Sequence, residues 1–310
     1  MYRYVLRRIL QLLPVLFIVT FIIFFIMYLA PGDPASIILG PTATPEAIQQ
    51  MNNDLGFYDP FFTRFFRYIY NAVFKLDFGM SYKTKEAVFK EIAARIPISL
   101  SIAFNGILLS ALIGIPLGIL SAVRQYSLWD TVPTIISMIF AAMPLFWLGM
   151  ILLYIFALKL GWLPSFGVGT WKHYILPMLA IGLPYAARQL RFTRSSMLET
   201  IREDYVRTAR AKGAPERTVI WKHALKNALL PVITILGTNF GNLFGGAVVT
   251  EALFSIPGIG TLLVTGINTR DLPIVMASVI TIAVIYSLVM LAVDLTYAYI
   301  DPRIKAKFSK

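Results

Sequence analysis

Few residues in this chain are suited to catalysis or metal binding. The sequence contains no cysteine, which excludes disulfides, thiolate metal sites and cysteine nucleophiles. It holds only two histidines, His173 and His223, and it lacks the H-E-x-x-H and G-x-S-x-G motifs. The G-x-x-x-x-G-K-[ST] phosphate-binding loop is missing as well. We therefore expect no catalytic residue, no metal site and no cofactor, and any ATP used by this system must be bound by another chain.

The densest group of ionisable residues is the stretch "EDYVRTARAKGAPERTVIWKHALKN", which ends at Asn227. Thr200 and Glu203 have the T-x-x-E spacing of a capping box, which predicts a helix over about 201–212. Gly213 suits the left-handed residue that ends a helix, and Pro215 suits the first position of the next one. A helix, a glycine stop and a second helix make a protruding knob, which suits docking to a cytoplasmic partner. The alternative is a solvated charged loop resting on lipid headgroups.

The rest of the chain has the composition of an integral membrane protein. Hydrophobic residues make up 57% of the 310 residues and charged residues 14%, against roughly a quarter charged in soluble domains. A soluble domain could not bury that much apolar surface. The net charge of +12 fits basic loops that stay in the cytoplasm better than nucleic-acid binding, for which no motif is present.

Apolar runs of about 20 residues predict about six transmembrane helices in an all-α fold. The first follows Arg7 and Arg8 and is too long for a signal peptide, so we expect it to be retained. The fourth is short and contains Pro177 and Pro184. The predicted spans are Ile9–Leu29, Ile98–Val123, Thr131–Leu158, Tyr174–Leu190, Leu229–Val249 and Ile274–Tyr297.

The basic residues indicate which ends of these spans face the cytoplasm. With the N-terminus inside, most of the 28 lysines and arginines fall in cytoplasmic segments, as the positive-inside rule requires. Those segments are Met1–Arg8, Arg124–Asp130, Arg188–Ala228 and Asp301–Lys310. Both termini and the polar stretch therefore face the cytoplasm, and the two histidines fall on opposite sides of a cell (cytoplasmic) membrane.

This topology divides the chain into four parts. Residues 1–30 form an N-terminal transmembrane helix, and residues 31–94 form a small extracytoplasmic insert with short helices near 45–51 and 60–74. Residues 95–300 form the main transmembrane domain, and residues 301–310 form a basic cytoplasmic tail. Within the main domain, the segment 251–273 contains too many helix breakers to span, so we expect an outer loop with a short re-entrant helix near 260–267.

The polar stretch resembles the signature loop of ABC-transporter permease subunits of the binding-protein-dependent importer class. That signature is E-A-A-x-x-x-G, nine residues, then I-x-L-P. Gly213 and Leu225 match it, whereas Arg207, His223 and Lys226 depart from it; Thr208 and Ala209 occupy the two alanine positions. These departures are typical of the dipeptide, oligopeptide and nickel subfamily. Further stretches similar to that subfamily are "PGDP" at Pro31–Pro34, "DFGMSY" at Asp77–Tyr82, "IPGIG" at Ile256–Gly260 and "RDLP" at Arg270–Pro273.

The resemblance implies a type I importer permease fold, with a cytoplasmic coupling loop at residues 193–228 that docks on an ATP-hydrolysing subunit. It also implies the partners: a second homologous permease, two ATP-binding cassette subunits that hold ATP and Mg²⁺, an extracytoplasmic solute-binding protein, and membrane lipid. The coupling residues implied are Tyr205, Thr208, Ala209, Ala211 and Gly213, braced by His223, Leu225 and Asn227. The implied cargo is a di- or oligopeptide moved by alternating access. A nickel chelate, glutathione or another small solute is the alternative.

Other polar and small residues within the spans allow two interpretations each. Gly237, Gly241 and Gly245 have small-x-x-x-small spacing, which predicts close helix packing, either inside the chain or with a second permease. A second set lines the solute path or serves structure alone: Asn105, Met143, Trp147, Asn239 and Asn242. Mid-span carboxylates are missing, and Asp294 lies at the inner end of the last span. This disfavours an intramembrane enzyme and an ion-driven secondary transporter.

Overall fold

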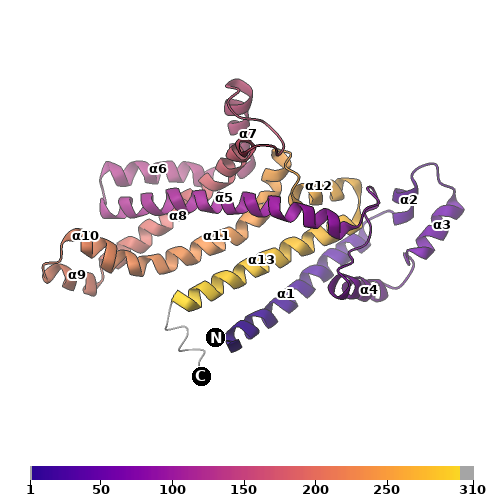
Figure 1. The fold of residues 1–310 in the computed structure, drawn as a ribbon, viewed down its shortest axis with the longest axis horizontal. Helices are drawn as coiled ribbons and strands as arrows, with labels where there is room; N and C mark the ends of the chain where they lie inside the picture. The colour runs from indigo at the N-terminus through magenta and orange to yellow at the C-terminus, as the bar shows by residue number, and fades with distance from the viewer. Residues whose placement is uncertain (1, 301–310) are drawn as a thin grey trace. The chain divides into compact units, whose positions relative to one another are not determined.

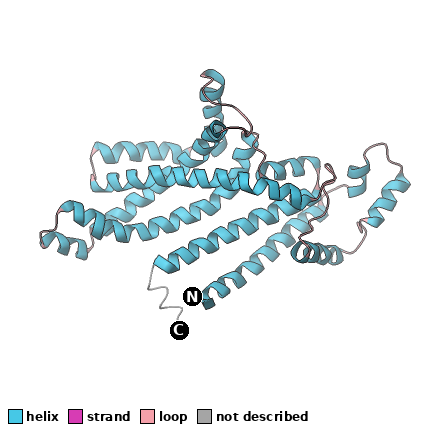
Figure 2. Ribbon diagram, in the orientation of Figure 1, coloured by secondary structure: helices cyan, strands magenta, loops and turns pink. Residues whose placement is uncertain are grey.

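A computed structural model describes residues 2–300 of the chain, and the described residues are helical with no β-strand (Figure 2). One isolated bridge pairs Met80 with Ala87. The predicted basic tail at 301–310 lies outside the described residues. The described residues divide into two compact units: those within 2–7, 100–256 and 286–300 form the first, and those within 8–99 and 257–285 form the second. The long helices α5 (Val88–Val123) and α13 (Leu272–Ile300) pass from one unit into the other.

Length and composition identify four helices among the described residues that are able to cross a membrane. They lie within α1 (Tyr2–Leu29), α5, the continuous stretch Glu216–Leu253, and α13. A fifth span is counted if the bent pair that starts at α6 (Leu128–Ala142) is one span. The remaining predicted span falls on α8 (Ile175–Ile201), whose apolar first half gives way to Arg188 and Arg191. The all-α membrane fold is therefore confirmed, with four or five spans where about six were predicted.

The third predicted span is not one straight helix. The chain turns by 104° between α6 and the helical stretch Leu145–Lys159, which comprises α7 (Leu145–Leu152) and the π-helical η1 (Leu153–Lys159). Met143 has extended backbone angles at the break, and Pro144 follows it. Proline has no N–H to donate and disfavours the α conformation in the residue before it, which explains the break at this position.

Helix α8 lies at the centre of the first unit and packs against α6, α7 and α11 (Leu225–Leu253). Its contact with α5 depends on glycines that the sequence analysis did not single out. A Cβ atom at Gly118 would lie 2.6 Å from Thr193 Cβ, and one at Gly114 would lie 2.7 Å from the carbonyl oxygen of Ala186. Gly114 and Gly118 are four residues apart, which is the small-x-x-x-small spacing of close helix pairs.

The second unit contains the predicted insert and the segment after α11. Its further helices are α2 (Pro34–Leu39), α3 (Pro45–Asp54), α4 (Phe61–Phe74) and α12 (Ile259–Thr269). The short helices predicted near 45–51 and 60–74 correspond to α3 and α4, and the predicted re-entrant helix corresponds to α12. Helix α5 begins at Val88, so the predicted boundary between residues 94 and 95 falls inside a helix. The charged residues Glu91 and Arg95 interrupt the apolar pattern, so the pattern did not show that the helix begins before them. In the helix the two side chains pair across one turn at 3.4 Å.

Three of the short motifs in this unit have defined structural roles. Asp33 of "PGDP" caps α2: its carboxylate accepts hydrogen bonds from the Ser36 N–H at 2.8 Å and from Asn52 of α3 at 2.8 Å. Ser81 of "DFGMSY" donates a hydrogen bond to Asp271 of "RDLP" at 2.5 Å. The second of these contacts joins residues that lie 190 positions apart, so it ties the segment before α5 to the start of α13.

Candidate functional site

The polar stretch forms a helical hairpin of the predicted kind, with a different start. Helix α8 continues to Ile201, where Thr200 donates to the Ser196 carbonyl oxygen instead of capping a new helix. Helix α9 (Asp204–Ala211) then begins with Glu203 at its N-cap, and no side-chain capping bond is present there. The predicted capping box is therefore wrong. The T-x-x-E pattern lies across the end of one helix and the start of the next.

The glycine stop is confirmed in detail. Gly213 has φ +78°, a left-handed conformation that glycine adopts without strain. Its N–H donates to the Arg210 carbonyl oxygen, and the Ala214 N–H donates to the Ala209 carbonyl oxygen. This pair of bonds is a Schellman motif, which satisfies carbonyl groups that the end of α9 would otherwise leave exposed. The turn after α9 is therefore closed by its own backbone.

The return arm begins with the short α10 (Glu216–Thr218), for which Pro215 is the N-cap residue and not the first helical one. It continues through the π-helical η3 (Val219–Ala224) into α11. An ion pair closes the hairpin: Arg210 Nη2 lies 2.7 Å from Glu216 Oε1, and Arg210 Nε lies 3.1 Å from Oε2. In Figure 1, α9 and α10 lie together at one end of the first unit.

A small apolar core holds the hairpin against the helices that enter and leave it. Val206 of α9 is fully buried, and it belongs to a cluster with residues of α5, α8, η3 and α11. The buried members are Ala122, Met197, Val206, Val219, Ile220, Ala224, Leu225 and Ala228, with Ala209 and Ala214 packed at the edge. Because α9 is only 8 residues long, it would be marginal by itself, and this core supplies its stability.

The predicted coupling residues fall on two faces of this hairpin. Tyr205, Thr208, Ala211 and Gly213 are exposed, and the Tyr205 side chain has 42% of its surface accessible. Ala209 instead turns toward the apolar core. The predicted braces lie on the return arm: Leu225 is a member of the core, and the Asn227 side chain donates to the His223 carbonyl oxygen at 3.3 Å. The exposed surface of α9 therefore carries Tyr205, Thr208 and Ala211 together with the charged side chains of Asp204 and Arg207, on a packed base.

A buried ion pair, which the sequence analysis missed, lies close to this core. Asp130 at the start of α6 accepts two hydrogen bonds from Arg194 of α8, at 2.6 and 2.8 Å. The Ser121 hydroxyl of α5 and the Tyr126 N–H also donate to the same carboxylate. This one carboxylate therefore ties three helices together within two turns of the end of α8. The topology prediction places Asp130 and Arg194 in two different cytoplasmic segments, and their separation of 64 positions gives no sign of the pairing in the sequence.

The five residues predicted for a solute path have different surroundings. Asn239 is buried and lies 3.5 Å from Gln189, which donates in turn to the Val232 carbonyl oxygen at 3.2 Å. Asn105 donates to Ser101 within its own helix, whereas Asn242 and Trp147 are exposed. Met143 lies at the break between α6 and α7. Asn239 thus has a structural hydrogen-bonding role, and the fully buried Gln189 is the partner that the sequence analysis missed.

The three glycines predicted to pack closely on α11 differ in their surroundings. A Cβ at Gly237 would collide with the Val293 side chain of α13, and one at Gly241 would lie 3.0 Å from the Tyr286 ring. A Cβ at Gly245 would meet no atom within 4 Å. Two of the three glycines therefore pack inside the chain, and Gly245 faces open space.

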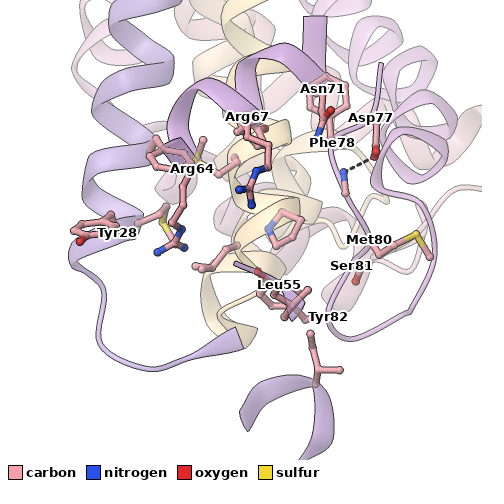
Figure 3. A pocket seen from close by; sticks show the side chains of 18 of the residues that line it. Tyr28, Leu55, Arg64, Arg67, Asn71, Asp77, Phe78, Met80, Ser81 and Tyr82 are labelled. Carbon is pink, nitrogen blue, oxygen red and sulfur yellow. Dashed lines mark hydrogen bonds between the residues drawn. The ribbon is translucent and has the colours of Figure 1, made fainter. Parts of the chain in front are cut away.

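The second unit contains a cavity of about 580 Å³, lined mainly by α4, the ends of α1 and α13, and residues 77–82 (Figure 3). Arg64 lines it, with its guanidinium 5.5 Å from the centre of the Tyr28 ring and one N–H donated to the Phe57 carbonyl oxygen. Burial lowers the pKa of Arg64 from its ordinary value, and burial with the nearby Asp271 charge raises the pKa of Tyr82 to about 12. None of the residues predicted for a solute path lines this cavity.

Known proteins identify the family to which this architecture belongs. Residues 114–306 match the family model described as binding-protein-dependent transport system inner membrane component, and residues 1–103 match the model for its N-terminal part. The glutathione transport system permease protein GsiC of Escherichia coli K12 is 41% identical over 99% of this chain and 100% of its own length. The protein of the same name from Shigella boydii is 40% identical with the same coverage.

Solved structures show the same fold at low sequence identity. The MetNI methionine ABC transporter, in an inward-facing conformation, superposes with a TM-score of 0.58 at 18% identity, covering 68% of this chain and 96% of that one. An amino acid ABC transporter crystallised with histidines gives a TM-score of 0.55 at 13% identity, covering 69% and 94%. The chain therefore belongs to the binding-protein-dependent transport system inner membrane component family, and it is a permease subunit of an ABC importer.

Proposed function

We propose that this chain forms one half of the translocation path of an ATP-driven importer for small peptides, and that α9 is the element that its ATPase partner grips. In this proposal the complete transporter contains a second homologous permease, two ATP-binding cassette subunits and an extracytoplasmic solute-binding protein. Both chain termini and the α9 hairpin face the cytoplasm, in keeping with the distribution of basic residues.

The observation that carries the docking proposal is the contrast between the two faces of α9. Its inner face packs on the core through the buried Val206. The Schellman turn and the Arg210–Glu216 ion pair hold the helix against the return arm. Its outer face presents Tyr205, Thr208 and Ala211 without burying them, beside the exposed pair of Asp204 and Arg207. Small side chains let a partner approach the helix closely, and a helix held by packing moves as a rigid body with its base.

The path by which such a motion would reach the bundle follows from the contacts of α8. A displacement of α9 pulls on the apolar core that it shares with α8 and α5. The Asp130–Arg194 pair then links α8 to α6, and the Gly114 and Gly118 contacts link α8 to α5. These tight contacts make the cytoplasmic ends of three helices move together, which is what alternating access requires of a packed bundle.

Small peptides are the proposed cargo because relatives 40–41% identical to this chain are named for glutathione, which is itself a short peptide. The subfamily motifs fit a peptide carrier too. The chain acts in this proposal without covalent chemistry. ATP hydrolysis takes place on the partner subunits, and the energy arrives through the contact at α9.

The absence of native cysteine allows the docking proposal to be tested by single-cysteine labelling. Tyr205→Cys and Thr208→Cys should react with a maleimide in the isolated chain and become protected in the transporter assembled with its ATPases. Thr63→Cys on α4, which is exposed in the second unit, is the control and should react equally in both states. Equal labelling of position 205 in both states would rule out docking through this face.

The cargo is tested separately, by uptake into proteoliposomes that contain the complete transporter and its solute-binding protein. We expect ATP-dependent accumulation of labelled glutathione or dipeptides. Accumulation of a nickel chelate alone would replace the peptide assignment without affecting the docking proposal. Uptake that continues without ATP would contradict the importer mechanism itself.

A further inference from the structure

Helix α4 has an exposed apolar face that the importer mechanism does not use. Phe62, Phe66, Tyr70 and Val73 are between 54% and 63% exposed. Their spacing of four, four and three residues places them on one stripe of the helix, within about 80° of arc at 3.6 residues per turn. Four large apolar side chains on one stripe form a contiguous patch, which a soluble surface rarely leaves bare.

The neighbouring face of α4, about 100° around the helix, packs on α1 through aromatic rings. Phe65 lies 5.6 Å from Phe17, 5.4 Å from Phe21 and 5.4 Å from Phe24, measured between ring centres. Phe61 lies 5.1 Å from Tyr28. These edge-to-face contacts fix α4 against the last three turns of α1, entirely within the second unit.

The position of those contacts along α1 places α4 at membrane depth. The span within α1 runs from Arg8 to Leu29, and only 6% of its most apolar stretch is buried by this chain, which leaves most of it open to lipid. Phe21 lies eight residues before Leu29, a distance of about 12 Å along the helix axis at 1.5 Å per residue. Helix α4 therefore lies beside the final part of the span and not beyond its end, and the lipid that surrounds α1 at this level also reaches α4.

The third sector of α4 is polar. Thr63, Arg67 and Asn71 follow one another at intervals of four residues, and Arg67 pairs with Asp59 at 2.6 Å. At the end of the helix, the Lys75 ammonium lies 5.5 Å from the centre of the Tyr70 ring. An apolar stripe beside a polar stripe, with tyrosine and lysine at their border, is the arrangement of helices that lie in the plane of a membrane interface.

We infer that α4 is an in-plane interfacial helix whose Phe62–Phe66–Tyr70–Val73 face is covered by lipid, at the level of the membrane where α1 ends. The helix anchors the insert to the bilayer, and it thereby sets the height of the cavity and of residues 77–82 relative to the membrane surface. The inference depends on α1 crossing the membrane and is independent of the cargo and of the ATPase contact.

The test uses the assembled transporter in lipid nanodiscs, with single cysteines carrying an environment-sensitive fluorophore. Val73→Cys is the main variant, because the side chain is similar in size and 62% exposed, and Phe66→Cys is the second. Thr63→Cys on the polar stripe of the same helix is the matched control. Quenching by phosphatidylcholine with a nitroxide on its acyl chain reports lipid contact, and quenching by iodide reports water contact.

We expect the labels at positions 73 and 66 to be quenched several-fold more strongly by the nitroxide lipid than the label at 63. Iodide should show the reverse order. Strong iodide quenching at 73 and 66 would show that the face is in water and would overturn the inference. Protection of these two labels from both quenchers would overturn it too, because a protein partner, and not lipid, would then cover the face.

Discussion

Arg194 of α8 donates two hydrogen bonds to Asp130 of α6, although the two residues are 64 positions apart. The same carboxylate accepts from Ser121 at the end of α5. Only 6% of the Asp130 side chain is exposed, against 26% for Arg194. The pair lies next to the apolar core under α9, so it joins the proposed docking hairpin to the ends of three helices.

Asp130→Asn tests this link, because it keeps the shape of the side chain and removes its charge. Breaking a fully buried ion pair costs about 3–5 kcal/mol, and the partial exposure of Arg194 lowers the expected loss to roughly 2 kcal/mol. We expect a lower midpoint of thermal unfolding and weaker ATP-driven uptake. Glu86→Gln is the control, since its carboxylate is 53% exposed, lies 3.1 Å from Lys90 and is outside the hairpin. Similar effects of the two substitutions would contradict the structural role of the buried pair.

The sequence predicted those features of the site that depend on local spacing. The glycine stop at Gly213 and the return arm follow from residues within one or two turns of each other, and both are present. The capping box failed because Thr200 had an equally local alternative, a bond back to the Ser196 carbonyl oxygen inside α8. Sequence spacing alone does not distinguish the end of one helix from the start of the next.

The sequence did not predict contacts between residues far apart in the chain, or the direction in which a given side chain points. Ala209 and Thr208 are adjacent, but one packs on the core and the other faces solvent, because α9 docks with Val206 inward. The Gln189–Asn239 contact joins two helices whose register no local pattern specifies. Hydropathy predicted the fold class. It did not predict the 104° turn after α6, because the angle at the Met143–Pro144 break depends on how the helices pack.

Two substitutions of Gly213 distinguish the effect of its backbone conformation from the effect of contact with the partner subunit. Its φ of +78° disfavours alanine by about 1 kcal/mol, whereas asparagine tolerates the left-handed region. No atom lies within 4 Å of a Cβ built there, so crowding inside the chain plays no part. We expect Gly213→Ala to reduce ATP-driven uptake and Gly213→Asn to retain most of it. Equal loss in both variants would instead indicate that the partner excludes any side chain at this position.

Substitutions at Val206 and Tyr205 distinguish the role of the packed base of the hairpin from the role of its exposed face. Val206→Ala removes two buried methyl groups, and we expect a stability loss of about 2 kcal/mol together with weaker coupling. Tyr205→Ala should leave the unfolding midpoint nearly unchanged and still lower the ATPase stimulation by solute. Ala209→Asp is not informative about docking, because it would place a carboxylate against the apolar core. A large stability loss in Tyr205→Ala would contradict the assignment of the two faces.

The α11 glycines separate packing within the chain from packing between subunits. Gly237→Ala places a methyl group against Val293 of α13, so we expect a lower unfolding midpoint of the isolated chain in detergent. Gly245→Ala has open space around it and should leave that midpoint unchanged. If the second permease packs against α11 at this level, Gly245→Ala will weaken co-purification of the two permeases while Gly237→Ala, once folded, will not. Because small residues let helices approach closely in a membrane, normal co-purification of Gly245→Ala would place that subunit interface elsewhere.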